Sequence, residues 1–125
     1  MNKLLSLTAI IEAATGLALI ALPAIVVRLL LGAEISGASI PLGRVAGAAL
    51  LALGVACWLA RNDRQSRTAR GLVVAMLVYN IVATAVLAFA GIGLGLHGVA
   101  LWPAVVLHAV MATWCIVCLR RSPSM

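Results

Sequence analysis

The sequence predicts an all-α fold, a single membrane domain over residues 1–125 built as a bundle of four transmembrane helices. Hydrophobic residues make up 65% of the chain and charged residues only 10%, and the mean hydropathy is +1.20. A soluble domain is typically about 45–50% apolar and about 25% charged, so this chain cannot cover a water-facing surface. Four spans of about 20 residues use most of its length and leave no room for a separate soluble domain.

The first span is expected over residues 4–22, with an extension to residue 31. Pro23 lacks a backbone donor and predicts that this helix is kinked or broken there. The second span is expected over residues 40–60, with Ser39 as its N-cap and Pro41 in its first turn. The third is expected over residues 71–90, and after a glycine-rich turn the fourth covers residues 99–119.

Basic residues predict the orientation of the bundle. One side of the predicted bundle carries Lys3, Arg61, Arg64, Arg67, Arg70, Arg120 and Arg121, whereas the other side has only Arg28 and Arg44. The positive-inside rule therefore places the N-terminus, the middle loop and the C-terminus in the cytoplasm. This position of the charges also explains the net charge of +6 without a nucleic-acid partner. Membrane lipids are the expected partners, with anionic headgroups near Arg61, Arg64, Arg67 and Arg70.

Three polar residues fall at membrane depth within predicted spans: Glu12, Asn80 and His108. A charged carboxylate in hydrocarbon costs about 2.5 kcal/mol or more, so such groups normally face the bundle interior and find partners. We therefore expect these three side chains to form a buried polar cluster. The cluster has two candidate roles: a hydrogen-bonded staple that fixes the helix order, or a proton-accepting or ligand-binding site.

Gly43, Gly47 and Gly54 predict close helix packing on the second span. The first two form a G-x-x-x-G pattern, and glycines at this spacing open a groove in which another helix backbone can approach closely. Packing within the bundle and self-association between copies are both compatible with this pattern.

The three cysteines, Cys57, Cys115 and Cys118, lie within apolar runs. A reactive thiol site needs an activating charge or a metal, and the sequence supplies no clear fourth ligand, so no metal site is predicted. Cysteine is also a common small apolar residue in helix interiors, and the reactivity of these thiols is left open. Haem would need a second histidine ligand, but His97 lies in the glycine-rich turn. No cofactor is predicted, and quinone and haem stay as alternatives.

Several features together resemble a known type of membrane protein. They are Glu12 and Gly16 in the first span, Pro23 followed by Gly32, the G-x-x-x-G pattern, and the segment from Trp58 to Arg61. This layout resembles small bacterial inner-membrane proteins of four helices and, more faintly, the DoxX-like proteins. The DoxX-like resemblance implies association with quinone-linked or thiol redox systems. No catalytic residue can be matched, so the resemblance implies a bacterial inner membrane and carries no activity with it.

No catalytic motif is identified, and a non-enzymatic role is favoured. The leading functional hypothesis is a small membrane protein that acts by helix packing, either as an accessory subunit of a membrane complex or as a homo-oligomer. One alternative is a proton- or quinone-linked redox component that uses Glu12 and His108. Another is an oligomeric transporter for a small solute.

Overall fold

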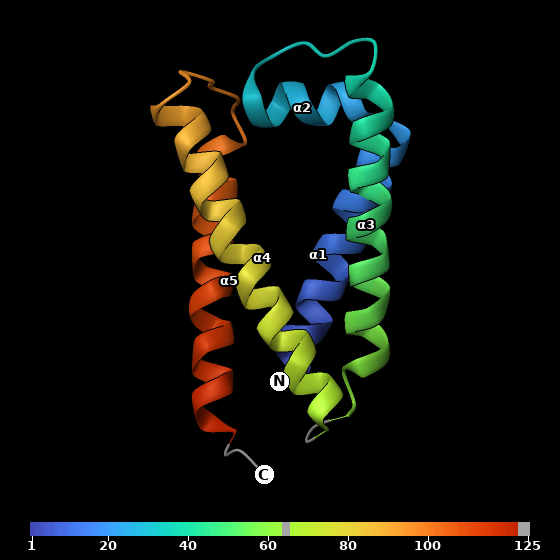
Figure 1. Ribbon diagram of the computed structural model, residues 1–125, viewed down its shortest axis with the longest axis vertical. Coiled ribbons are helices and arrows are strands. Elements are labelled where there is room, and N and C mark those ends of the chain that lie inside the picture. Colours follow the sequence, from blue (N-terminus) through green and yellow to red (C-terminus); the bar gives the residue numbers. More distant parts are fainter. Residues whose placement is uncertain (64–65, 123–125) are drawn as a thin grey trace.

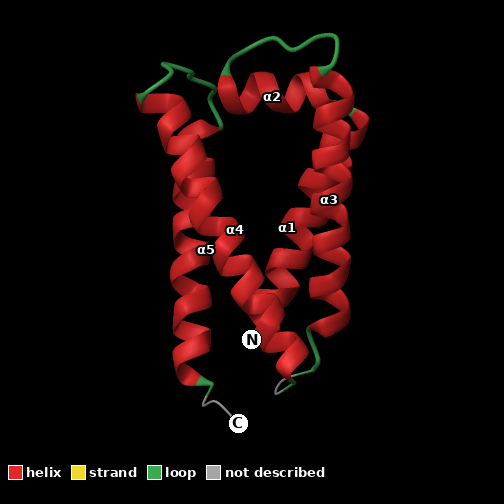
Figure 2. Ribbon diagram, viewed as in Figure 1, coloured by secondary structure: helices red, strands yellow, loops and turns green. Residues whose placement is uncertain are grey.

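The computed structural model describes residues 1–63 and 66–122, and within these ranges the chain forms five α-helices (Figures 1 and 2). They are α1 (Asn2–Ala21), α2 (Pro23–Leu31), α3 (Ser39–Ala60), α4 (Arg67–Ile92) and α5 (Leu101–Arg121). Four of these described helices, α1, α3, α4 and α5, are long and apolar enough to cross a membrane. The predicted all-α class with four spans is confirmed.

The chain changes direction between α1 and α2. Leu22 lies between the two helices with φ −136° and ψ 58°, and Pro23 is the first residue of α2. A proline has no backbone N–H to continue the hydrogen bonds of α1, but it is well suited to the first turn of a new helix. As a result α2 lies roughly crosswise to the long helices, at the end of the molecule opposite the start of α1 and the end of α5 (Figure 1).

The fourth helix begins one turn earlier than the expected third span, at Arg67. Its N-cap is Ser66, whose hydroxyl oxygen accepts a hydrogen bond of 3.0 Å from the backbone N–H of Ala69. This cap satisfies one of the free N–H groups at the helix start. Arg67 and Arg70 are therefore helical residues, and their side chains project from α4 at defined positions.

The long helices form two pairs, α1 with α3 and α4 with α5. The first pair is close because glycines face each other across it. A Cβ atom on Gly16 would lie 2.6 Å from the carbonyl oxygen of Gly47, and one on Gly54 would lie 2.9 Å from the backbone nitrogen of Ala13. Only glycine permits this approach of two backbones. Gly43 faces the start of α2, where an added Cβ would lie 3.2 Å from the Cβ of Pro23.

The two pairs are joined at both ends. At the end that holds α2, the backbone N–H of Ala100 donates to the carbonyl of Leu29 over 2.9 Å, and Gly98 packs directly on the backbone of α2. At the opposite end, a cluster of buried residues from α1, α3, α4 and α5 forms the core: Leu4, Leu5, Ala9, Cys57, Val73, Met76, Met111, Cys115 and Cys118. Between these ends the two pairs diverge toward α2 (Figure 2).

Candidate functional site

Asn80 and His108 are in direct contact across the α4–α5 interface. The Asn80 side chain is 1% exposed, and its Nδ2 donates to the carbonyl of Met76 over 2.8 Å. This bond orients the amide, so Oδ1 points away from Met76 and lies 2.8 Å from Nδ1 of His108. An amide oxygen can only accept a hydrogen bond, so Nδ1 of His108 is the donor and carries a proton.

Tyr79 connects this pair to α1. The rings of Tyr79 and His108 meet edge to face, with centroids 5.5 Å apart and an interplanar angle of 84°. The hydroxyl of Tyr79 and the carboxyl group of Glu12 lie close enough to interact electrostatically. Glu12 is only 4% exposed although it lies in the middle of an apolar helix. Its polar partner is therefore supplied by α4.

These four residues, Glu12, Tyr79, Asn80 and His108, are called the polar chain below. The structure brings Asn80 and His108 together directly, whereas Glu12 reaches them through Tyr79. Sequence reasoning missed Tyr79, although a signal was present. It is the single tyrosine of the sequence, it adjoins Asn80 in an apolar run, and a buried tyrosine hydroxyl usually finds a hydrogen-bond partner.

Thr8 adds an unsatisfied group next to the polar chain. Its side chain is 1% exposed, and Oγ1 has no hydrogen-bond partner among the residues that the structure describes. Residues four apart share one face of a helix, so Thr8 lies one turn from Glu12 on the same side of α1. Thr84 differs, because its hydroxyl donates to the carbonyl of Asn80 over 2.7 Å.

The cysteines lie in the core at the end that holds the chain termini. All three are free and buried, and Cys57 lies within electrostatic range of both Glu12 and Cys115. Within residues 1–63 and 66–122, no group of three or more His, Cys, Asp or Glu side chains is arranged to hold a metal ion. In this position the thiols pack as small apolar groups beside the polar chain.

The four arginines expected at lipid headgroups have different surroundings. Arg61 stacks on Trp58, with its guanidinium carbon 3.7 Å from the ring centroid, and also donates to the Trp58 carbonyl. Arg70 donates from Nη1 to the carbonyls of Leu119 and Ser122, over 3.3 and 2.9 Å. It therefore caps the end of α5. Arg67 is exposed, and Arg64 lies outside the described residues.

Comparisons of the chain with protein families, with curated proteins and with solved structures find no match. In the neutral ring of His108 the proton is on Nδ1, so Nε2 carries a lone pair that can accept a hydrogen bond or a proton. The Glu12 carboxyl group is a second acceptor, and the Thr8 hydroxyl is a free donor. These groups have the chemistry to accept or donate hydrogen bonds, and at Glu12 and His108 to exchange a proton.

Proposed function

We propose that this protein is a small multi-pass membrane protein whose polar chain binds, and exchanges protons with, a lipid-soluble ligand of the quinol–quinone class. The observation that carries the proposal is the contact between Asn80 and His108, because it holds the proton on Nδ1 and leaves Nε2 as an acceptor. A quinol hydroxyl donates to such an acceptor, and a quinone carbonyl accepts from a hydroxyl or an imidazolium. The proposed chemistry is hydrogen bonding and proton exchange, with electron transfer left to a redox partner in the membrane.

The unsatisfied hydrogen-bonding groups of the site support ligand binding over a purely structural role. A buried staple is most stable when every polar atom in it has a partner, because an unpaired buried group costs about 1–3 kcal/mol. Here the Thr8 hydroxyl has no partner within residues 1–63 and 66–122, and a carboxyl group such as that of Glu12 accepts more hydrogen bonds than a single tyrosine supplies. A ligand with two oxygen atoms would satisfy both.

The proposed location is the bacterial cell membrane, with both chain termini in the cytoplasm. The distribution of charge supports this orientation. The start of α1, the end of α3, the start of α4 and the end of α5 lie at one end of the molecule (Figure 1), and this end carries Lys3, Arg61, Arg67, Arg70, Arg120 and Arg121. At the opposite end Arg28 forms an ion pair with Glu34 over 2.5 Å. The positive-inside rule assigns the more basic end to the cytoplasm.

The test is a binding titration of the purified protein in lipid nanodiscs with a short-chain, water-soluble quinone and its quinol. We expect saturable binding of the quinol to the wild-type protein and at least tenfold weaker binding to Glu12→Gln and to His108→Phe, because each loses an acceptor worth about 1.5 kcal/mol. Glu34→Gln makes the same chemical change outside the spans and should bind as the wild type does. Absence of saturable binding to the wild type, or equal binding to Glu12→Gln, would refute the proposal.

Assembly with another membrane protein or a second copy is the second candidate function. The outward face of α3 favours it, because the exposed Leu42, Val45, Val55 and Leu59 alternate there with exposed alanines. Small residues among branched ones allow another helix to pack closely. Gly47 and Gly54 are already used against α1, so this outward face is the surface left for a partner.

Replacing Ala52 on this outward face with tryptophan tests the assembly proposal, because a bulky residue would separate a partner without touching α1. A fall in the mass of the complex extracted in mild detergent, with an unchanged helical content, is the expected result. An unchanged mass would refute assembly through this face. The oligomeric small-solute transporter stays a third hypothesis.

A further inference from the structure

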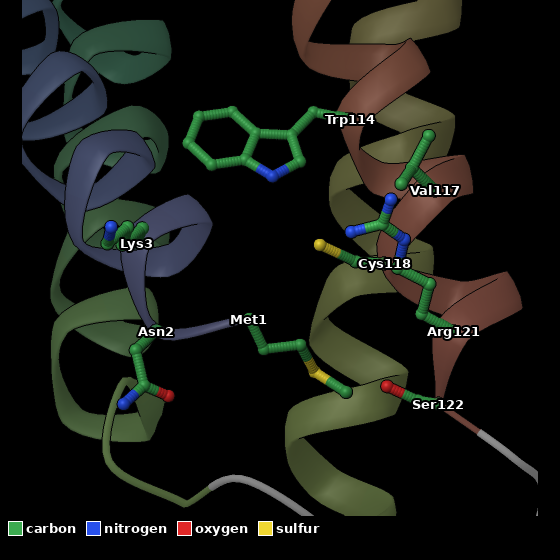
Figure 3. A pocket seen from close by; sticks show the side chains of 8 residues that line it. All are labelled: Met1, Asn2, Lys3, Trp114, Val117, Cys118, Arg121 and Ser122. Carbon is green, nitrogen blue, oxygen red and sulfur yellow. The ribbon is translucent and has the colours of Figure 1, made fainter.

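A pocket lies between the first turn of α1 and the last turns of α5, at the end of the molecule that carries the chain termini (Figure 3). Its volume is about 450 Å³, and no residue that lines it is acidic. Lys3 and Arg121 contribute the positively charged side chains of the pocket, from α1 and α5 respectively, and Met1 adds its α-amino group. The polar chain does not line it, so this pocket is separate from the proposed ligand site.

The two basic side chains are available to a ligand. Both are exposed, and among the described residues neither takes part in an ion pair. At the end of α5, the carbonyls of Leu119 and Ser122 accept hydrogen bonds from Arg70 rather than from Arg121. Arg70 thus interacts favourably with the negative end of the α5 dipole, and the exposed Arg121 can attract an anion.

The walls of the pocket change from polar to apolar along α5. Arg121 and Ser122 lie at the helix end, whereas Val117 and Trp114 lie one and two turns further into the span. Figure 3 shows the Trp114 indole extending from α5 toward α1 above the basic groups. An indole with an apolar body and one N–H donor suits the boundary between headgroups and acyl chains. The pocket is therefore basic at its opening and apolar on its inner wall. A phospholipid has the matching order, with a charged headgroup at the membrane surface and acyl chains inside.

We propose that this pocket binds an anionic phospholipid, with its phosphate group between Lys3 and Arg121 and its acyl chains against Trp114 and Val117. Charge complementarity and the order of the walls identify the occupant, since basic pockets between spans at a cytoplasmic surface recognise acidic headgroups. The proposal rests on the membrane placement of the four long helices and is independent of proton exchange at the polar chain.

The test is native mass spectrometry of the full chain in detergent, titrated with phosphatidylglycerol and with phosphatidylcholine of the same acyl chains. The first phosphatidylglycerol should bind at least tenfold more tightly than phosphatidylcholine. The double variant Lys3→Gln and Arg121→Gln should weaken phosphatidylglycerol binding roughly 25-fold, because the loss of each surface charge weakens binding about fivefold. The charge-retaining double variant, Lys3→Arg and Arg121→Lys, should keep most of the affinity.

The matched control removes two arginines at the same end that do not line the pocket, in the double variant Arg67→Gln and Arg120→Gln. It should leave the affinity for the first lipid within about twofold. An equal loss in this control would overturn the proposal, because binding would then depend on diffuse surface charge. Equal affinity for the two lipids would also overturn it. Displacement of the lipid by low-millimolar inorganic phosphate would overturn the lipid assignment, because the site would then be one for a soluble anion.

Discussion

The Nδ1 atom of His108 lies 2.8 Å from Oδ1 of Asn80, while Nδ2 of the same amide is held by the carbonyl of Met76. The amide cannot rotate to offer its nitrogen to the imidazole without losing the bond within its own helix. The interaction therefore determines which imidazole nitrogen is protonated, and through it which atom of the ring is offered to a ligand.

This relationship predicts the tautomer of His108. In protein labelled with ¹⁵N-histidine and reconstituted in lipid, solid-state NMR should show a neutral ring protonated at Nδ1. Asn80→Leu should abolish this preference, because the acceptor is lost while a side chain of similar size remains. His97, which is exposed in the turn before α5, provides the internal reference in the same spectra. A wild-type His108 protonated at Nε2 would contradict the geometry.

Gly47→Ala should weaken the α1–α3 pair. An added Cβ would lie 2.6 Å from the carbonyl oxygen of Gly16, so the backbones must separate, at a cost of about 1–3 kcal/mol in the free energy of unfolding. Gly71→Ala is the matched control, because no atom lies within 4 Å of its added Cβ and alanine favours the helix by about 0.5–1 kcal/mol. Unfolding in mixed micelles with increasing dodecyl sulfate measures both. Equal stability of the two variants would count against the close packing of α1 on α3.

Gly32→Ala should cost more stability than Gly95→Ala. Both glycines have a positive φ, of 64° and 66°, so alanine is strained at either position by about 1–2 kcal/mol. Only at Gly32 would the Cβ also overlap the carbonyl of His97, where α2 docks on the turn before α5, whereas nothing lies near it at Gly95. Thermal unfolding in detergent should therefore show the larger loss for Gly32→Ala. Identical losses would mean that α2 is not held against this turn.

Arg70→Gln should loosen the last turn of α5. The guanidinium donates to two carbonyls there, and its loss should remove about 0.5–1.5 kcal/mol of local stability. Hydrogen–deuterium exchange of the peptide that covers the end of α5 should be faster by about two- to tenfold. Arg67→Gln is the control, one turn earlier on α4 and exposed. If this control exchanges as fast as Arg70→Gln, the capping contact is not responsible.

The candidate site could be predicted only in part. The sequence identifies Glu12, Asn80 and His108, because a polar residue in an apolar run is visible without a structure. It does not show that Tyr79 links Glu12 to the other two. Adjacent residues of a helix point about 100° apart, so Asn80 can face α5 while Tyr79 faces α1, but this assignment depends on how α4 is rotated about its axis. Likewise, the G-x-x-x-G pattern predicts that a helix packs in its groove, but it does not show whether this helix is α1 or belongs to a second copy of the chain.

The sequence by itself determines that this is an all-α chain of four apolar spans, and that the first helix is kinked or broken at Pro23. Hydropathy, span length and the missing N–H of proline are properties of the local chain, so they can be read without knowing its neighbours. The tertiary structure decides the partners: Gly47 with Gly16, Tyr79 with Glu12, and Arg70 with the end of α5. These contacts depend on the rotation and crossing of whole helices, which result from packing summed over many residues rather than from any single stretch of sequence.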